Sequence, residues 1–301
     1  MAWRPFRGVF VILATPFSDD GSLDEDGLRD VVEFSIAAGA HGLVSPANAS
    51  EFSALSDPER LRVIEVVGRM ARGRLPFVAG VSGVSAQVAV WLAKHAADAG
   101  ADAVIAMPPY ISKPPADGVR AYYQALSGAT ELPIFIQNYP LPVGVPMSAG
   151  LLGQLAHEIE RVDYIKEEVP PVTHSVSADI AACGDSVEGV FGGAAGRFML
   201  DEMSRGAVGT MPACDVPEVH AAVWNAWQAG DVSGAREVFN RLLPLLNFEM
   251  LHSVQGYKEV LRRRGVIRSA HVRTAATGPL DAHDHAELDA ILSDISDLWS
   301  I

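Results

Sequence analysis

The run Arg161-Val-Asp-Tyr-Ile-Lys166 has the composition of a short buried strand, and runs of the same kind recur along the chain. Side chains alternate between the two faces of a strand, so Val162, Tyr164 and Lys166 are predicted to share one face. Most of the runs are continuously apolar, which is typical of parallel strands covered by helices. The predicted strands are Val9–Ala14, His41–Ser45, Pro76–Gly80, Ala103–Met107, Ile134–Gln137, Val162–Lys166, Val187–Phe191 and Ala207–Met211.

Longer amphipathic stretches, which predict helices, separate these strands. Ser22-Leu-Asp-Glu25 is a capping-box pattern, and Asp57-Pro58 is an N-cap followed by proline, so each predicts a helix start. Ser85 is expected to open a third helix that stops at Gly100. Strands and helices that alternate eight times predict a (β/α)₈ TIM barrel. A doubly wound open sheet is the alternative, because the pattern alone does not show closure.

Beyond residue 229 the alternation ends and only helical patterns follow. The sequence therefore predicts a barrel domain at residues 1–229 and a C-terminal helical domain at residues 230–301. The predicted helices of this extension, with breaks at Pro244 and Gly265, are Ser233–Leu246, Ser253–Arg264 and His283–Trp299.

Composition excludes several classes of protein. A chain of 301 residues with 49% hydrophobic content is long enough to bury a large core and a smaller one. The net charge of −14 argues against binding to nucleic acid or to an anionic membrane surface. The apolar run at residues 8–17 is too short for a membrane span and reads as a strand rather than a signal peptide. Cys183 and Cys214 match neither a disulfide framework nor a metal motif, so a cytoplasmic protein is expected.

Lys166 is the first candidate for chemistry. A lysine on a buried strand face is costly while charged, and desolvation favours the neutral amine, which is nucleophilic toward carbonyl groups. The alternative is that Lys166 merely ends a strand and pairs with a neighbouring glutamate. In a (β/α)₈ barrel the chemistry lies at the carboxyl ends of the strands, so the other strand ends help to decide.

The predicted strand ends bring one lysine together with amide, hydroxyl and glycine positions. They contain no cluster of His, Asp and Glu with metal-binding spacing, so neither a metal nor a cofactor is expected. This combination suits imine chemistry on a small carboxylate. The positions at the strand ends are Thr15, Asn48, Ala49, Ser50, Tyr110, Gln137, Tyr139, Lys166, Glu168, Gly193 and Met211.

Several motifs in a fixed order carry a resemblance to a known family. They are Gly8…Thr15-Pro16-Phe17, Ser50-Glu51, Gly100-Ala-Asp-Ala-Val…Pro109-Tyr110…Lys113-Pro114, the Lys166 strand and Arg205-Gly-Ala-Val-Gly209. Over nearly its whole length the chain resembles the dihydrodipicolinate synthase / N-acetylneuraminate lyase superfamily of Schiff-base-forming lyases. The resemblance implies an imine on Lys166 with a pyruvate-type 2-oxo acid. It also implies a homotetramer, with tight-dimer contacts near Tyr110 and Ile111.

The sequence departs from the family pattern at its most informative positions. The usual Gly-Thr-Thr-Gly-Glu loop is replaced by Ala47-Asn-Ala-Ser-Glu51, whose backbone N–H groups and whose Asn48 and Ser50 side chains are expected to hold a carboxylate. The tyrosine of the family's Tyr-Asn-x-Pro pattern falls on Gln137. The second family tyrosine falls on Ile111, and the substrate-binding arginine falls on Pro142.

These departures resemble the branch that contains 2-keto-3-deoxy-L-arabonate dehydratases, as do Met107-Pro-Pro-Tyr110 and Lys166-x-Glu168. An aldolase needs a base at the C4 hydroxyl, whereas Gln137 orients a hydroxyl but takes no proton. Dehydration needs removal of a C3 proton, for which Glu168 or Lys166 is a candidate. Tyr139 is the residue that would restore a phenol if it turned into the site.

The sequence therefore predicts a lyase that acts on a 2-keto-3-deoxy sugar acid, with dehydration as the favoured reaction. The alternatives are a dihydrodipicolinate synthase, a pyruvate-dependent aldolase and a non-catalytic regulatory protein that binds a 2-oxo acid. The predicted catalytic residues are Lys166, Gln137 and Glu168. The predicted substrate-binding residues are Asn48, Ala49, Ser50, Tyr110, Tyr139, Gly193 and Met211.

Overall fold

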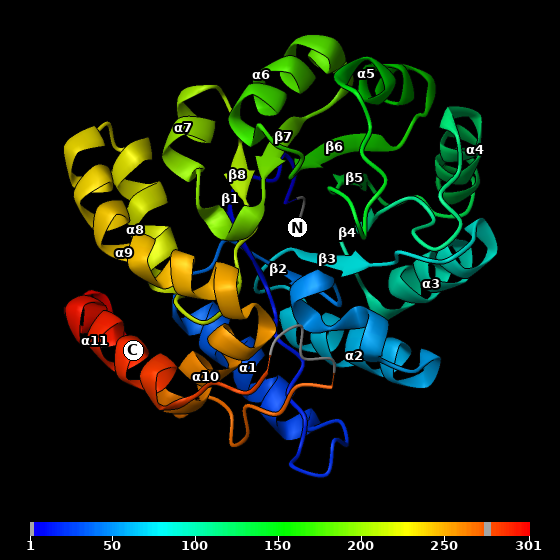
Figure 1. The fold of residues 1–301 in the computed structure, drawn as a ribbon. Coiled ribbons are helices and arrows are strands. Elements are labelled where there is room, and N and C mark those ends of the chain that lie inside the picture. Colours follow the sequence, from blue (N-terminus) through cyan, green and yellow to red (C-terminus); the bar gives the residue numbers. More distant parts are fainter. Residues whose placement is uncertain (1–2, 274–277) are drawn as a thin grey trace.

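Eight parallel strands close into a barrel in chain order (Figure 1). The structure is a computed structural model that describes residues 3–273 and 278–301. Each strand pairs with the next, and β1 pairs with β8, so the open-sheet alternative is excluded. The strands are β1 (Gly8–Ile12), β2 (Gly42–Ser45), β3 (Phe77–Gly80), β4 (Ala103–Ala106), β5 (Ile134–Asn138), β6 (Val162–Glu167), β7 (Gly189–Gly192) and β8 (Gly209–Thr210).

One helix follows each strand and covers the outer face of the barrel (Figure 1). Apolar side chains from the helices and from the outward faces of the strands form the main hydrophobic core. This arrangement explains the continuously apolar strands, which are buried on both faces. The helices are α1 (Glu25–Ala37), α2 (Asp57–Ala71), α3 (Ala86–Ala99), α4 (Ala116–Ser127), α5 (Ala149–Glu158), α6 (Val172–Cys183), α7 (Met199–Ser204) and α8 (Pro217–Gln228).

Two of the predicted helix caps are shifted along the chain. Asp24 caps α1 in place of Ser22, because the Ser22 hydroxyl belongs to the preceding turn. Ser56 caps α2 in place of Asp57, which is already the first helical residue. Ser85 caps α3 as predicted, because its hydroxyl accepts a hydrogen bond from a backbone N–H in the first helical turn.

The faces of β6 differ from the simple alternation predicted from sequence. Tyr164 lies in the core inside the barrel, and Lys166 points into the same interior, whereas Val162 packs in the outer core. The register with β5 shifts between Ile134 and Phe135, so one residue of β6 is left over in a bulge. The prediction that Val162 shares a face with Lys166 is therefore wrong.

Aromatic rings fill the barrel toward the amino-terminal side of Lys166. Phe135 and Tyr164 stack with ring centroids 4.4 Å apart, and Phe191 meets both rings edge-on. Phe6 and Phe10, from the N-terminal segment and β1, complete this layer. Because Tyr164 lies two residues before Lys166 in β6, the aromatic layer forms the floor beneath the lysine.

Within the described residues, three further α-helices follow the barrel: α9 (Val232–His252), α10 (Val254–Arg263) and α11 (Ala282–Ile295). The predicted break at Pro244 is wrong, because α9 continues through it to His252. The division at residue 229 stays a prediction, although side chains of α9, α10 and α11 share the main hydrophobic core with the barrel. Among residues 3–273 and 278–301, no helix has the length and hydropathy of a membrane span.

Candidate active site

A cavity of about 180 Å³ opens at the carboxyl ends of the strands. This end of a (β/α)₈ barrel is where catalytic residues are found. Six of the predicted site residues line the cavity together: Asn48, Ala49, Tyr139, Lys166, Glu168 and Met211. The cavity is smaller than the roughly 300–1,000 Å³ typical of sites for drug-sized ligands, so it suits a small substrate.

The three predicted catalytic residues form one connected group. Lys166 is only 1% exposed, and its Nζ lies 3.1 Å from Glu168 Oε2. Gln137 pairs with Lys166 in the β5–β6 register, and its Nε2 donates a hydrogen bond of 2.7 Å to the same Glu168 oxygen. The other oxygen, Oε1, accepts from the backbone N–H of Ala194 at 3.2 Å. Glu168 is therefore held between the amine and the amide, within reach of a molecule bound to Lys166.

Gly193 makes room for this carboxylate. A Cβ atom at Gly193 would lie only 2.3 Å from Glu168 Cγ, so any larger residue would displace the Glu168 side chain. Gly193 was predicted to bind substrate, but it does not line the cavity. Its place in the structure indicates an indirect role, in which it fixes the position of Glu168.

Tyr139 brings a phenol to the cavity that the family pattern does not supply at this position. Burial raises the pKa of this phenol above its usual value, and the nearby charge of Glu168 raises it further. The hydroxyl therefore stays protonated near neutral pH and acts as a hydrogen-bond donor. Tyr139 lies in the cavity wall. A turn of its side chain toward Lys166, which the sequence raised as an alternative, stays a prediction.

The loop after β2 contributes Asn48 and Ala49 to the cavity, but it turns Ser50 away. The Ser50 hydroxyl accepts a hydrogen bond of 3.0 Å from Ala47 N, and Thr15 donates to the Ser50 carbonyl at 2.7 Å. Ser50 is fully buried and its hydroxyl stabilises the loop itself. Ser50, which was predicted to bind substrate, does not line the cavity, because its hydroxyl accepts from the backbone of its own loop.

Asn48 keeps hydrogen-bonding capacity for a ligand. Its Nδ2 atom is buried and has no acceptor in hydrogen-bonding geometry among the described residues, although Asn48 lies close enough to Tyr139 to lower the pKa of the phenol. A buried donor without an acceptor costs free energy unless a ligand or a water molecule satisfies it. Asn48 is therefore the side chain of this loop that is best placed to bind substrate.

Tyr110 was also predicted to bind substrate, but it lies outside the cavity wall. Its ring meets Phe52 edge-on, with centroids 5.6 Å apart. The neighbouring Ile111 is 72% exposed. An exposed apolar side chain at this position suits a contact between subunits better than a contact with substrate.

Two cavity residues come from the C-terminal extension and were not predicted. Ser253 lies between α9 and α10 with a left-handed backbone (φ 51°), and Tyr257 lies on α10. The hydroxyl of Tyr257 donates to the carbonyl oxygen of Ala49 at 3.3 Å. The adjacent Lys258 forms a buried ion pair with Glu51 of the same loop. In sequence, a single tyrosine within an amphipathic helix is indistinguishable from a packing residue.

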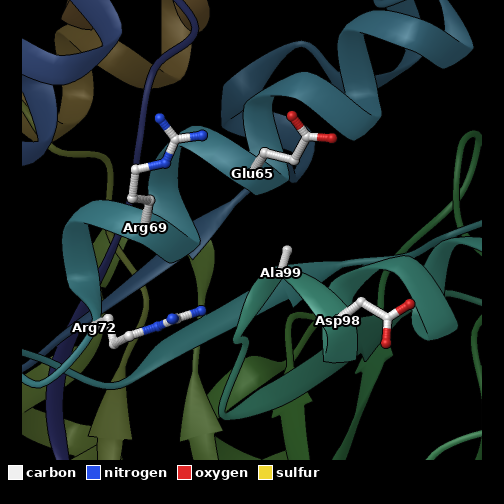
Figure 2. Close-up of a pocket in the computed structure, with 5 residues that line it drawn as sticks. All are labelled: Glu65, Arg69, Arg72, Asp98 and Ala99. Atoms are coloured by element: carbon white, nitrogen blue, oxygen red, sulfur yellow. The ribbon is translucent and has the colours of Figure 1, made fainter.

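A second hollow, of about 280 Å³, lies between α2 and α3 (Figure 2). Its wall carries charges of both signs, and Arg69 and Arg72 are exposed. The hollow lies toward the carboxyl ends of α2 and α3, which run antiparallel to the strands, and therefore at the face opposite Lys166. It is lined by Glu65, Arg69, Arg72, Asp98 and Ala99. The Lys166 cavity is thus the candidate active site.

A buried lysine beside a carboxylate at the carboxyl-terminal end of a closed barrel is the arrangement expected of a Schiff-base-forming lyase. The model of the Dihydrodipicolinate synthetase family matches residues 5–295. The chain therefore belongs to this family, and it is an enzyme of the lyase class to which the family's members belong.

The relatives of this chain include a protein named as a dehydratase and proteins named as synthases. An L-2-keto-3-deoxyarabonate dehydratase of Azospirillum brasilense is 33% identical over 89% of this chain and 87% of its own length. A 4-hydroxy-tetrahydrodipicolinate synthase of Acidiphilium cryptum is 35% identical over 80% of this chain and 82% of its own length. The dihydrodipicolinate synthase of Acinetobacter baumannii, solved with pyruvate, superposes with a TM-score of 0.89 at 28% identity, covering 97% of this chain and 99% of that one.

Proposed function

We propose that this protein dehydrates a 2-keto-3-deoxy sugar acid through an imine on Lys166. The observation that carries the proposal is the group formed by Lys166, Glu168 and Gln137, in which an amide stands where the family pattern has a phenol. The 33% identity to an L-2-keto-3-deoxyarabonate dehydratase supports it. Family membership and the intact lysine favour an enzyme over a non-catalytic regulatory protein.

The proposed reaction starts with attack of the Lys166 amine on the C2 carbonyl, which releases water and forms an iminium ion. The positive nitrogen makes the C3 protons acidic, and the Glu168 carboxylate is placed to take one of them. The resulting enamine expels the C4 hydroxyl, and the proton that Glu168 holds leaves with it as water. For a five-carbon substrate, the conjugated iminium then loses a proton from C5 and gains one at C3, and the resulting enol takes a proton at C4 to become the C5 aldehyde. Hydrolysis of the imine then consumes water and regenerates the free lysine.

Cleavage of the carbon–carbon bond would need a different proton transfer. Retro-aldol cleavage requires a base at the C4 hydroxyl, and an amide such as Gln137 has no basic site for that proton. Gln137 donates its N–H to Glu168 but is not among the residues that line the cavity, so it acts on the reaction through that carboxylate. The local chemistry therefore favours elimination of water.

Tyr139 supports the second candidate function, which is a pyruvate-dependent aldolase or a dihydrodipicolinate synthase. Its phenol lines the cavity and is the nearest replacement for the tyrosine of the family pattern. Several relatives are named 4-hydroxy-tetrahydrodipicolinate synthase. Pro142 nevertheless stands where the resemblance places the arginine that binds the second substrate of that reaction, which argues against the synthase.

A product assay tests the proposal. With 2-keto-3-deoxy-L-arabonate we expect 2-oxoglutarate semialdehyde as the main product, with little pyruvate or glycolaldehyde. Gln137→Tyr should raise the cleaved fraction, because help from a general base is typically worth about 10²–10⁴-fold. Mainly pyruvate from the wild type would identify an aldolase, and Tyr139→Phe should then suppress cleavage. Condensation of pyruvate with aspartate semialdehyde would instead identify a dihydrodipicolinate synthase.

We also propose that the protein is a homotetramer. The exposed side chains of Ile111, Leu141 and Val143 gather on the loops after β4 and β5, where Lys113 Nζ contacts the carbonyl of Pro142. Light scattering at micromolar concentration should give about four times the chain mass of 32.0 kDa. Ile111→Asp should dissociate the tight dimer, since it would bury a charge without a partner. A wild type that runs as a monomer would contradict the proposal.

A further inference from the structure

The phenol of Tyr257 has no function in the reaction described so far, yet it lies in the cavity wall beside the loop after β2. The side chain is 7% exposed, so α10 delivers a nearly buried hydroxyl to this point. The helix is held there by the buried ion pair between Lys258 and Glu51. The position of Tyr257 is therefore fixed by the same loop that supplies Asn48 and Ala49 to the cavity.

Among the described residues, the hydroxyl of Tyr257 makes a single hydrogen bond, and that bond is long. Its Oη lies 3.3 Å from the Ala49 carbonyl oxygen, whereas hydroxyl-to-oxygen hydrogen bonds usually span about 2.5–3.0 Å. A carboxylate within reach would be a stronger acceptor than a neutral carbonyl. Burial raises the pKa of the Tyr257 phenol well above its usual value, so the hydroxyl keeps the proton it would donate.

The loop itself presents no hydroxyl to the cavity. Ser50 uses its hydroxyl on Ala47 N, and Ala49 has none. The donors that line the cavity on this side are the hydroxyl of Tyr257 and the Nδ2 of Asn48, which lies beside the Tyr139 phenol but has no acceptor in hydrogen-bonding geometry among the described residues. Two neighbouring donors without a good acceptor are suited to binding an anionic oxygen pair.

We propose that Tyr257 binds the carboxylate of the 2-oxo acid. Its hydroxyl, which comes from the C-terminal extension, replaces the hydroxyl that the loop after β2 does not direct into the cavity. On binding, the phenol O–H turns from the Ala49 carbonyl to the carboxylate while the ring stays in place. This assignment rests on the proposed function only in taking a 2-oxo acid as the ligand. It does not depend on whether water is eliminated or a carbon–carbon bond is cleaved.

The test measures the pyruvate concentration that gives half-maximal trapping of the borohydride-reduced adduct, followed by intact mass. Tyr257→Phe should raise this concentration about 10- to 100-fold, the range for loss of a hydrogen bond to a charged group. The maximal yield of adduct should stay near that of the wild type. With methyl pyruvate, whose ester carries no charge, the concentration for half-maximal trapping should rise by less than about 10-fold in the same variant.

A matched control separates binding from stability. Tyr123 is also a buried tyrosine, and its hydroxyl donates to the Ala106 carbonyl at 2.8 Å, but it lies away from the cavity. Tyr123→Phe should leave half-saturation by pyruvate unchanged. In a Tyr257→Phe background, Ala49→Ser should recover part of the lost affinity, because it returns a hydroxyl to the same wall.

The outcomes that overturn the proposal are distinct. The proposal fails if the pyruvate concentration for half-maximal trapping is unchanged in Tyr257→Phe. It also fails if this concentration rises by the same factor for pyruvate and for methyl pyruvate, since Tyr257 would then have a structural role only. If the variant does not fold, a crystal structure of the wild-type reduced pyruvate adduct decides. Tyr257 Oη should then lie within about 3.2 Å of the adduct's carboxylate, and a carboxylate bound elsewhere contradicts the assignment.

Failure of the wild type to form any adduct would overturn the imine on Lys166 and this proposal together, whereas a normal adduct without dehydration would overturn only the proposed elimination.

Discussion

Lys166→Ala should abolish both the borohydride-trapped adduct with pyruvate and the turnover of sugar acids. Without the amine no covalent intermediate forms, and the loss in kcat should be at least about 10⁴-fold, as is typical when a nucleophile is removed. The adduct in the wild type should map to Lys166 by peptide mass. Lys94→Ala is the matched control, because Lys94 is an exposed lysine on α3 and should leave the adduct unchanged.

The structure makes this prediction sharper than the sequence does. Lys166 is buried in the cavity, whereas the other buried lysine, Lys258, is engaged by Glu51 and by the carbonyl of His271. The ion pair between Lys166 and Glu168 does not by itself indicate a purely structural role for the lysine, because both residues line the cavity and Gln137 also donates to the same carboxylate. An adduct that persists in Lys166→Ala at wild-type yield would assign the imine to another amine.

The barrel could be predicted from sequence because alternation of strand and helix is a strong local signal. Strands buried on both faces read as apolar runs, and the predicted ends lie within about two residues of those observed for most strands. Closure could not be predicted, since it depends on the pairing of β1 with β8, whose residues are about 200 positions apart. The continuation of α9 through Pro244 is likewise a case in which tertiary packing overrides a local helix breaker.

The site was predictable where a residue's place follows from the strand that carries it. Lys166 and Gln137 lie on adjacent strands, so their contact through Glu168 follows from topology. The place of Ser50 outside the cavity lining could not be predicted, because the direction of a loop side chain depends on which backbone group it satisfies. Tyr257 was missed because its approach to the cavity depends on how α10 packs over the barrel, and no pattern within the helix encodes that placement.

Glu168→Gln should separate imine formation from proton transfer. The variant retains its size and the contact with Ala194 N, but it has no carboxylate to accept a C3 proton. Dehydration should fall about 10²–10⁴-fold, the usual contribution of a general base, whereas the pyruvate adduct should still form. The direct measurement is exchange of the pyruvate methyl protons for deuterium by NMR, since enamine formation requires removal of a C3 proton whatever happens later at C4.

The same exchange experiment distinguishes the competing bases. If Glu168 is the base, exchange should fall in Glu168→Gln by the same factor as dehydration, and it should survive in Tyr139→Phe. Exchange that persists in Glu168→Gln but disappears in Tyr139→Phe would identify the Tyr139 phenol as the group that removes the C3 proton. Glu160→Gln provides the control, because that carboxylate is largely exposed, with 82% of its side chain accessible, and lies outside the cavity wall. Glu168 contacts both the amine and Gln137, so a loss of exchange without loss of the adduct would identify this carboxylate as the group that removes the C3 proton.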